Sequence, residues 1–233
     1  ESESRGLGDV YKRQFLNYSK KGIPIHISLS GGSTPKVLFE TLALPKWSES
    51  ILWSNLHFWW GDERCVHPTD PQSNFGEAQR ILFRNINLPP ENIHRVMGEW
   101  NPDEASAKYT QEMADHILSN EDGSPVFDWI LLGMGDDGHT ASLFPQGISP
   151  ELQEFTAVAT HPISGQKRVS KTLKVINAAQ RISFLVTGSA KEHIFTGLKN
   201  NTEESKTWPA GWIKVNEKEP EWWLDAAAAS FKG

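Results

Sequence analysis

The chain has 233 residues, 38% of them hydrophobic and 22% charged, a composition typical of globular proteins and too apolar for a disordered chain. With 23 Lys and Arg against 29 Asp and Glu, the formal net charge is −6, so we expect no nucleic-acid partner and no anionic membrane surface as a partner. The single cysteine, Cys65, excludes an internal disulfide and a cysteine-based zinc cluster, and no apolar run approaches the ~18 residues that cross a bilayer. These features predict a soluble, cytoplasmic, globular protein.

Residues 1–14 are polar, lack the apolar segment of a secretory signal, and show no helical or strand periodicity. We expect a ragged or non-native start there, followed by one domain over residues 15–233. Four short apolar runs, each followed by glycine or by Ser-Gly, predict buried parallel strands. These runs are residues 23–29, 56–60, 127–132 and 181–187.

Apolar residues at helical spacing predict helices at residues 35–42, 74–86, 102–118 and 190–198. Thr34 and Asn101 are the expected N-caps of the first and third helices, and Pro35 is the expected first helical residue. Strand, glycine turn and helix in this repeated order predict a single-domain α/β fold. We expect a mostly parallel, Rossmann-like sheet with helices on both faces. Ligands bind such sheets beyond the carboxyl ends of the strands, where glycine-rich turns lead into helices.

The first such turn is Ser30-Gly31-Gly32-Ser33-Thr34-Pro35. Two glycines let the backbone approach a ligand closely, and the helix behind them presents unpaired N–H groups and a positive dipole end. The turn suits a phosphate, with two hydroxyls as further donors. An ordinary strand-to-helix turn also needs a glycine and a cap, so this alternative stays open.

The second turn, Gly61-Asp62-Glu63-Arg64, places three charges directly after a run with two tryptophans. Buried charges need partners, and Arg64 can bind a phosphate through two hydrogen bonds while Asp62 or Glu63 orients it or binds sugar hydroxyls. An internal network in which Glu63 only holds the loop is an equal alternative. We expect Cys65 to be a packing residue.

The third turn, residues 133–140, contains Gly-x-Gly-x-x-Gly after a strand. We reject a dinucleotide site because Asp136 and Asp137 would repel a pyrophosphate, and because Pro145 interrupts the helix that such a site requires. A better interpretation holds His139 at the turn with Asp137 or Asp136 orienting its imidazole. An unperturbed histidine titrates near ~6.5, which suits a general base, although a structural histidine remains the alternative.

Together the three turns resemble those of the 6-phosphogluconolactonases, in the glucosamine-6-phosphate isomerase/6-phosphogluconolactonase family. The resemblance runs from about Ile23 to the C-terminus; the segment GHTASLFP is specific, whereas the SGGSTP turn is shared with sugar-phosphate isomerases and deaminases. The matching segments are 29–35, 60–64 with 73–74, and 133–145, with weaker matches at 168–170, 177–179, 187–191 and 223–229.

The resemblance implies hydrolysis of 6-phospho-D-glucono-1,5-lactone, a phosphorylated sugar lactone, to 6-phospho-D-gluconate in the oxidative pentose phosphate pathway, without metal or organic cofactor. It implies that His139 is the general base that activates water and that Asp137 holds it. The implied substrate-binding residues are Gly31, Gly32, Ser33, Thr34, Arg64, Arg168 and, more weakly, Lys191. We expect a monomer or a weak homo-oligomer.

Two features depart from the family pattern. Lys171 stands where an uncharged strand residue is expected, and residues 1–14 do not resemble the helix that precedes the family's first strand. Without that helix, one face of the sheet would lose its cover and the fold its stability.

Two other functions compete with lactone hydrolysis. A glucosamine-6-phosphate deaminase resembles the chain at the first and third turns, but deaminases carry an acid in an Ala-Phe-Asn-Glu-Pro type sequence where this chain has residues 140–145, Thr-Ala-Ser-Leu-Phe-Pro. A non-catalytic sugar-phosphate sensor would keep the phosphate-binding turn; the presence of His139 with Asp137 argues against it.

Overall fold

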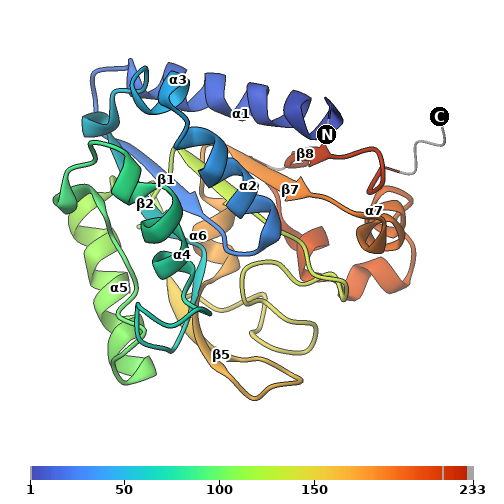
Figure 1. Cartoon of the computed structure of the whole chain (residues 1–233). Coiled ribbons are helices and arrows are strands. Elements are labelled where there is room, and N and C mark those ends of the chain that lie inside the picture. The colour runs from blue at the N-terminus through green and yellow to red at the C-terminus, as the bar shows by residue number, and fades with distance from the viewer. Residues whose placement is uncertain (1, 217, 230–233) are drawn as a thin grey trace.

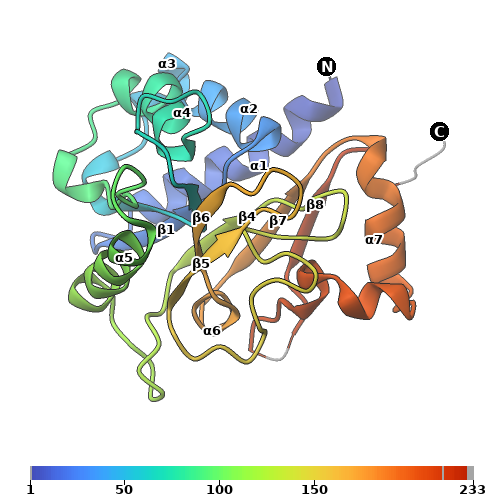
Figure 2. The ribbon, with the colours of Figure 1, turned by 90° about the horizontal axis from the view of Figure 1, so that it is seen from below.

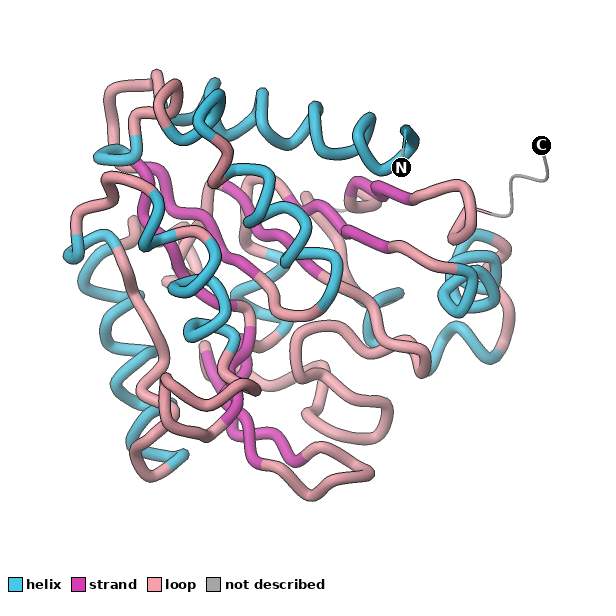
Figure 3. The backbone as a smooth tube through the Cα atoms, viewed as in Figure 1, coloured by secondary structure: helices cyan, strands magenta, loops and turns pink. Residues whose placement is uncertain are grey.

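A five-stranded, fully parallel sheet forms the centre of the computed structural model, which describes residues 2–216 and 218–229 (Figures 1 and 3). The strands are, in sheet order, β2 (Leu56–Trp60), β1 (Ile25–Leu29), β4 (Trp129–Leu132), β7 (Ile182–Val186) and β8 (Glu221–Leu224). The first four coincide with the four apolar runs, which confirms the predicted α/β class. β8 was not predicted.

Helices cover both faces of this sheet (Figure 2). Successive strand residues point to opposite faces, so Trp59 belongs to the core under α5 and Trp60 to the core under α2 and α4. Side chains are therefore buried on each face, which is why most strand residues are apolar. In β1, His26 and Ser28 alternate with apolar residues but are buried as well. The described helices are α1 (Ser2–Ser19), α2 (Ser33–Leu42), α3 (Pro45–Ser48), α4 (Asn74–Ile81), α5 (Pro102–His116), α6 (Leu173–Asn177) and α7 (Glu192–Lys199).

The expectation that residues 1–14 carry no regular structure is wrong, because α1 runs through them and covers the sheet. Tyr11 and Phe15 are buried and pack against Trp129, with ring centroids 6.1 and 5.2 Å apart respectively. These two aromatics are four residues apart, as on one helical face, but the polar residues before them hide the pattern. The helix that precedes the first strand, which the sequence did not predict, is therefore present and covers one face of the main sheet.

The helix after β1 begins earlier than predicted. Its N-cap is Gly32, with φ of 108°, and no side chain caps it, so Thr34 is a helical residue and not the cap. Asn101 does cap α5, since its side-chain oxygen accepts from the backbone N–H of Asp103 at 2.9 Å. None of the helices within the described ranges is long and apolar enough to span a membrane.

A small antiparallel sheet, which the sequence analysis missed, lies beside the main one. Its strands are, in order, β3 (Asp62–Arg64), β6 (Lys167–Lys171) and β5 (Thr156–Thr160). The second glycine turn is therefore a single residue, Gly61, from which the chain passes directly into β3. This continuation keeps the charges after Trp60 in extended backbone paired to β6.

Lys171, the departure from the family pattern, is fully buried under the junction of the two sheets. Its ammonium nitrogen donates to the Trp60 carbonyl oxygen, and it lies 3.2 Å from both Ser28 Oγ and Tyr109 Oη. Burial lowers the pKa of Lys171 well below its usual value, and the charge of Asp62 offsets this only in part. The side chain thus acts as a polar link between β1, β2 and α5.

A Lys171→Met variant is expected to reveal the protonation state of this amine. Because the pKa is lower in the folded than in the unfolded state, unfolding takes up a proton, so wild-type stability rises with pH below the unfolded pKa of ~10.4. Relative to Lys171→Met, the wild-type free energy of unfolding should rise with pH as the pH approaches the unfolded pKa, by up to about 1.4 kcal/mol per pH unit. Urea unfolding at several pH values measures this; a difference independent of pH would mean that Lys171 stays charged in the fold.

Candidate active site

A cavity of about 270 Å³ opens at the carboxyl ends of β1, β2, β4 and β7. Such volumes lie at the small end of ligand pockets, and this edge of a parallel sheet is where ligands bind. Of the site residues that the family resemblance implies, Asp137 alone is not in the wall of the cavity, although it contacts His139, which is. Those in the wall are Gly31, Gly32, Ser33, Thr34, Arg64, His139, Arg168 and Lys191. Asp62 also lines the cavity, whereas Glu63 does not.

His139 and Asp137 form a tight pair in the loop after β4. Asp137 Oδ1 lies 2.5 Å from His139 Nδ1 and accepts from the His139 backbone N–H at 3.1 Å. Partial burial opposes ionisation of Asp137, but these contacts with His139 outweigh it and hold the pKa of Asp137 below its usual value. The carboxylate therefore fixes the ring through Nδ1 and leaves Nε2 available to a ligand. Asp136 does not orient the His139 ring; its carboxylate instead accepts a hydrogen bond from the Lys191 ammonium.

The glycines of this turn make room for the His–Asp pair. A Cβ on Gly135 would come within 2.1 Å of His139 Nδ1 and 2.7 Å of Asp137 Oδ1, while Gly138 has φ of 79° and contacts Trp208. Close side-chain approach thus explains Gly135 and backbone conformation explains Gly138, without a pyrophosphate, whereas Gly133 meets neither condition.

We expect Gly135→Ala to displace His139 and to lower turnover about as far as loss of the histidine itself. One methyl group suffices because small misplacements of a reacting group can cost about 10²-fold in rate. The measurement is kcat for the variant, with its circular dichroism spectrum and melting temperature as controls for folding. Gly133→Ala is the matched comparison, because its Cβ would meet no atom within 4 Å; equal turnover in the two variants would contradict the explanation.

The first turn and the beginning of α2 form another wall. Gly31 packs so closely on Asn74 that a Cβ would come within 1.8 Å of its side-chain oxygen. The Thr34 hydroxyl makes a 2.7 Å hydrogen bond with the Thr187 hydroxyl, which joins the turns after β1 and β7 across the cavity. Ser30 Oγ is buried and has no hydrogen-bond partner among the described residues, so it is available to a ligand.

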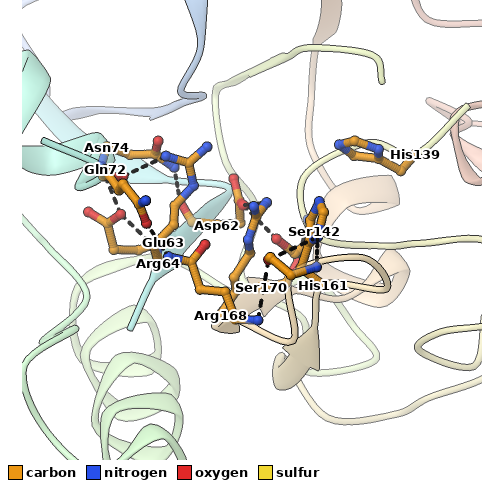
Figure 4. Close-up of polar contacts among 12 residues, drawn as sticks. Asp62, Glu63, Arg64, Gln72, Asn74, His139, Ser142, His161, Arg168 and Ser170 are labelled. Carbon is orange, nitrogen blue, oxygen red and sulfur yellow. Dashed lines mark hydrogen bonds and ion pairs between the residues drawn. The ribbon is translucent and has the colours of Figure 1, made fainter. Parts of the chain in front are cut away.

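Asp62 connects β3 to the loop after His139 (Figure 4). Its carboxylate accepts from Ser142 Oγ at 2.6 Å, and the backbone N–H of Ser142 donates to Ser170 Oγ at 3.1 Å. Arg168 Nη1 approaches the same carboxylate at 3.9 Å. The position of His139 relative to the small sheet is thereby fixed through buried polar contacts.

Glu63 holds the loop, as the structural alternative proposed. Its carboxylate accepts from the backbone N–H groups of Arg64, Asn74 and Phe75 at 2.8 Å each and from the Ser73 hydroxyl at 3.1 Å. It thereby anchors the beginning of α4.

Cys65 is half-buried, and burial raises the pKa of its thiol. A thiol whose pKa is raised is a poor nucleophile at neutral pH, as expected of a packing residue.

Arg64 and Arg168 face each other directly across the β3–β6 pair. Like charges in this register repel, unless an anion lies between them. The Nε atoms of both residues are buried and lack hydrogen-bond partners among the described residues, and both side chains line the cavity. Burial lowers the pKa of Arg168, with Asp62 partly compensating. Arg64 Nη1 also donates to the Gln72 carbonyl oxygen at 2.5 Å, so each guanidinium is held in place while its Nε–H stays open to an anion.

Three residues near the site were given no role from the sequence: Ser142, Phe144 and His161. Ser142 and Phe144 lie in the loop after β4, whereas His161 directly follows β5, and no apolar alternation in β5 and β6 predicted these short strands. Within the described ranges, no group of three or more His, Cys, Asp and Glu side chains could hold a metal ion.

Comparisons with known proteins agree with this geometry. A family model described as glucosamine-6-phosphate isomerases/6-phosphogluconolactonase matches residues 6–222. A 6-phosphogluconolactonase from Haemophilus influenzae is 48% identical over 220 residues, which cover 94% of this chain and 93% of the relative. A solved structure called devB protein is also 48% identical, with a TM-score of 0.95 over 99% of this chain and 96% of that one. A monomeric glucosamine-6-phosphate deaminase, 21% identical with a TM-score of 0.79 over 97% and 95% of the two chains, shares the fold. The chain belongs to the glucosamine-6-phosphate isomerase/6-phosphogluconolactonase family.

Proposed function

We propose that this chain hydrolyses 6-phospho-D-glucono-1,5-lactone to 6-phospho-D-gluconate, and that the domain that carries the activity includes α1 as well as residues 15–233, because Tyr11 of α1 packs against Trp129. One observation carries the proposal: a histidine oriented by a carboxylate shares one cavity with two cross-strand arginines whose Nε atoms have no hydrogen-bond partner among the described residues. A base and an anion site are what hydrolysis of a phosphorylated lactone requires. The 48% identity to a curated 6-phosphogluconolactonase supports the same reaction.

In the proposed mechanism His139 is the general base. Its Nε2 takes a proton from water as the water oxygen attacks the lactone carbonyl carbon, and Asp137 stabilises the imidazolium that forms. The carbonyl oxygen then carries the negative charge, which polar groups already in place can stabilise. As the carbonyl re-forms, the ring C–O bond breaks and the imidazolium returns its proton to the departing oxygen. The product is an open-chain acid, and no electron acceptor is needed.

Arg64 and Arg168 bind the phosphate in this proposal. Guanidinium groups bind phosphate through paired hydrogen bonds, and a dianion between the two would relieve their repulsion. Gly31, Gly32, Ser33 and Thr34 line the remaining wall, where the first N–H groups of α2 and the Ser30 hydroxyl can bind hydroxyls or phosphate oxygens. Lys191 contacts substrate only if it leaves Asp136, so we assign it a secondary role.

The decisive experiment couples freshly generated 6-phosphogluconolactone to 6-phosphogluconate dehydrogenase and NADP. Formation of 6-phosphogluconate must be faster with the protein than by spontaneous hydrolysis, in proportion to protein concentration. A folded protein that gives no acceleration would refute the proposal.

Deamination of glucosamine 6-phosphate is the second candidate, favoured only by the shared fold. The five residues after His139 are Thr140, Ala141, Ser142, Leu143 and Phe144, and none of them supplies a carboxylic acid for opening an aminosugar ring. Release of ammonia from glucosamine 6-phosphate, without turnover of the lactone, would establish this second activity.

A further inference from the structure

His161 lies beside the site but has no role in the mechanism above. It begins the turn between β5 and β6, where its backbone N–H donates to the Gln166 carbonyl at 2.9 Å and its carbonyl accepts from the Gly165 N–H at 2.9 Å. This hairpin runs next to the loop that follows β4 (Figures 1 and 2). The turn therefore holds the histidine beside the loop that carries His139 and Phe144.

The orientation of the His161 ring is fixed by its own turn. The Nδ1 atom lies 3.3 Å from the Ile163 backbone nitrogen, 3.1 Å from that of Ser164, and 3.1 Å from the Ser164 hydroxyl. Backbone N–H groups only donate, so Nδ1 is the acceptor, and in the neutral ring the proton is on Nε2. Over residues 2–216 and 218–229 the structure shows no acceptor for this Nε2–H.

A buried aromatic ring joins His161 to the site residues. The Phe144 ring, only 2% exposed, has its centroid 5.2 Å from that of His161, 4.9 Å from that of His139, and 5.6 Å from the Arg168 guanidinium carbon. All three side chains thus pack around one rigid group. In Figure 4, His161 is drawn between Arg168 and His139.

The charges around His161 are mostly positive. Burial, small as it is, lowers the pKa of His161, and the charges of Arg168, His139 and Arg64 lower it further, while Asp137 acts in the opposite direction. In the ligand-free protein these neighbours hold the ring in its neutral form. A phosphate dianion bound at the arginines would reverse the local field and favour an additional hydrogen-bond donor there.

We propose that His161 is a further substrate-binding residue, whose Nε2–H donates to the phosphate of the sugar ligand beside Arg168. The proposal rests on the proposed function for the identity of the substrate, and its geometry rests on the turn and on Phe144. His161 closes the anion site on the side opposite Arg64, so that the phosphate is held by two guanidinium groups and one imidazole. The residue selects for phosphorylated ligands and takes no part in the chemical step.

The test uses His161→Asn in the full chain. Asparagine retains a side-chain oxygen that can accept from the N–H two residues ahead, so the turn keeps its internal acceptor, while the Nε2–H donor is lost. Ser164→Ala is the matched control, because it removes a hydroxyl at Nδ1 from the same turn and leaves the donor intact. Calorimetry with 6-phosphogluconate measures the dissociation constant without turnover. Steady-state kinetics compare 6-phosphogluconolactone with unphosphorylated glucono-1,5-lactone.

We expect His161→Asn to raise the dissociation constant of 6-phosphogluconate, and the KM for the phosphorylated lactone, about tenfold, the value of one charge-assisted hydrogen bond. Its kcat on the phosphorylated lactone and its kcat/KM on the unphosphorylated lactone should stay within about twofold of wild type, as should all constants of Ser164→Ala. Unchanged binding of 6-phosphogluconate by His161→Asn would overturn the proposal, and so would an equal loss on both lactones. A wild-type protein that binds 6-phosphogluconate without hydrolysing the lactone would refute the proposed function, while the binding comparison would still decide the role of His161.

Discussion

Replacing His139 by alanine is expected to lower kcat by roughly 10²–10⁴, the usual contribution of a positioned general base. The structure gives the reason: Asp137 holds Nδ1 at 2.5 Å and leaves Nε2 as the basic atom in the cavity. A δ-lactone is an activated ester, so most of the remaining barrier is removal of the proton from the attacking water. Without the imidazole, bulk water would have to accept that proton.

The assay for this variant compares kcat and ligand affinity separately. The dissociation constant of 6-phosphogluconate should stay close to that of wild type, because the opposed arginines and the first turn are unaffected. His193→Ala is the matched control, since this histidine side chain is 75% exposed on α7. Retention of full kcat by His139→Ala would remove the histidine from the mechanism.

Asp137→Asn distinguishes the orienting carboxylate from the base. The amide can still accept from the His139 backbone N–H, but it cannot stabilise an imidazolium by charge. The expected kcat therefore lies between those of wild type and His139→Ala. A loss greater than that of His139→Ala would mean that the carboxylate itself acts on substrate or water.

The main sheet was predictable from the sequence, whereas the small sheet was not. Each of β1, β2, β4 and β7 is buried on both faces and is therefore a run of apolar residues that ends at a glycine-containing turn. By contrast, β6 reads Lys-Arg-Val-Ser-Lys, with an exposed lysine at one end and a buried lysine at the other. Its place depends on pairing with β3, about a hundred residues earlier in the chain, and no local pattern records this pairing.

The difference between local sequence patterns and long-range pairing also applies to the active site. The turns after predicted strands were located correctly, because glycine at the end of a buried strand is a local signal. That Arg64 and Arg168 are direct cross-strand partners, and that Phe144 packs against His139 and His161, follows only from the tertiary structure. Local sequence thus indicated the walls of the cavity, and long-range pairing decided which side chains face one another in it.

Four histidines outside the active site form a second group of titratable side chains. His26 and His57 are register partners on β1 and β2, and their rings lie 4.9 Å apart. The His94 ring stacks on Trp59 at 3.9 Å, and His116 of α5 lies 4.8 Å from His94. His26 and His94 are buried, His57 is half-buried, and His116 is exposed.

Protonation of this histidine cluster is opposed by burial and by the cluster itself. Burial, together with the charges of the other three histidines, lowers the pKa of His26 to about 3. Burial, His94 and His116 lower the pKa of His57 to about 4, although Glu91 acts in the opposite direction. The hydrogen bonds agree, since His26 Nδ1 accepts from the Trp59 indole N–H at 3.1 Å and cannot also carry a proton. The other facing carboxylates are Glu112, 2.8 Å from His94 Nδ1, and Asp128, which accepts from the His26 backbone N–H.

We therefore expect the protein to lose stability steeply between about pH 6.5 and pH 4. Both histidines bind a proton in the unfolded state below their ordinary pKa of ~6.5, but in the folded state only near pH 3 to 4, so unfolding takes up protons throughout this window. Each contributes about 1.4 kcal/mol per pH unit, so the two together should lower the free energy of unfolding by about 3 kcal/mol per unit near pH 5. Above pH 6.5 their contribution to stability is fully present and independent of pH.

His57→Asn should roughly halve this slope, and urea unfolding at half-unit intervals from pH 7 to 4.5 measures it. His57 is the better choice than His26 because it is only partly buried, so its replacement leaves the packing under Trp59 in place. His193→Asn serves as the control and should leave the slope unchanged. Burial raises the pKa of Glu63 and of Asp128, but these carboxyl groups are present in all three proteins, so the difference between the slopes isolates the contribution of His57. A wild-type slope near zero at pH 5 to 6 would mean that the cluster protonates without unfolding, which requires the rings to separate and the Trp59–His26 hydrogen bond to break in the folded protein.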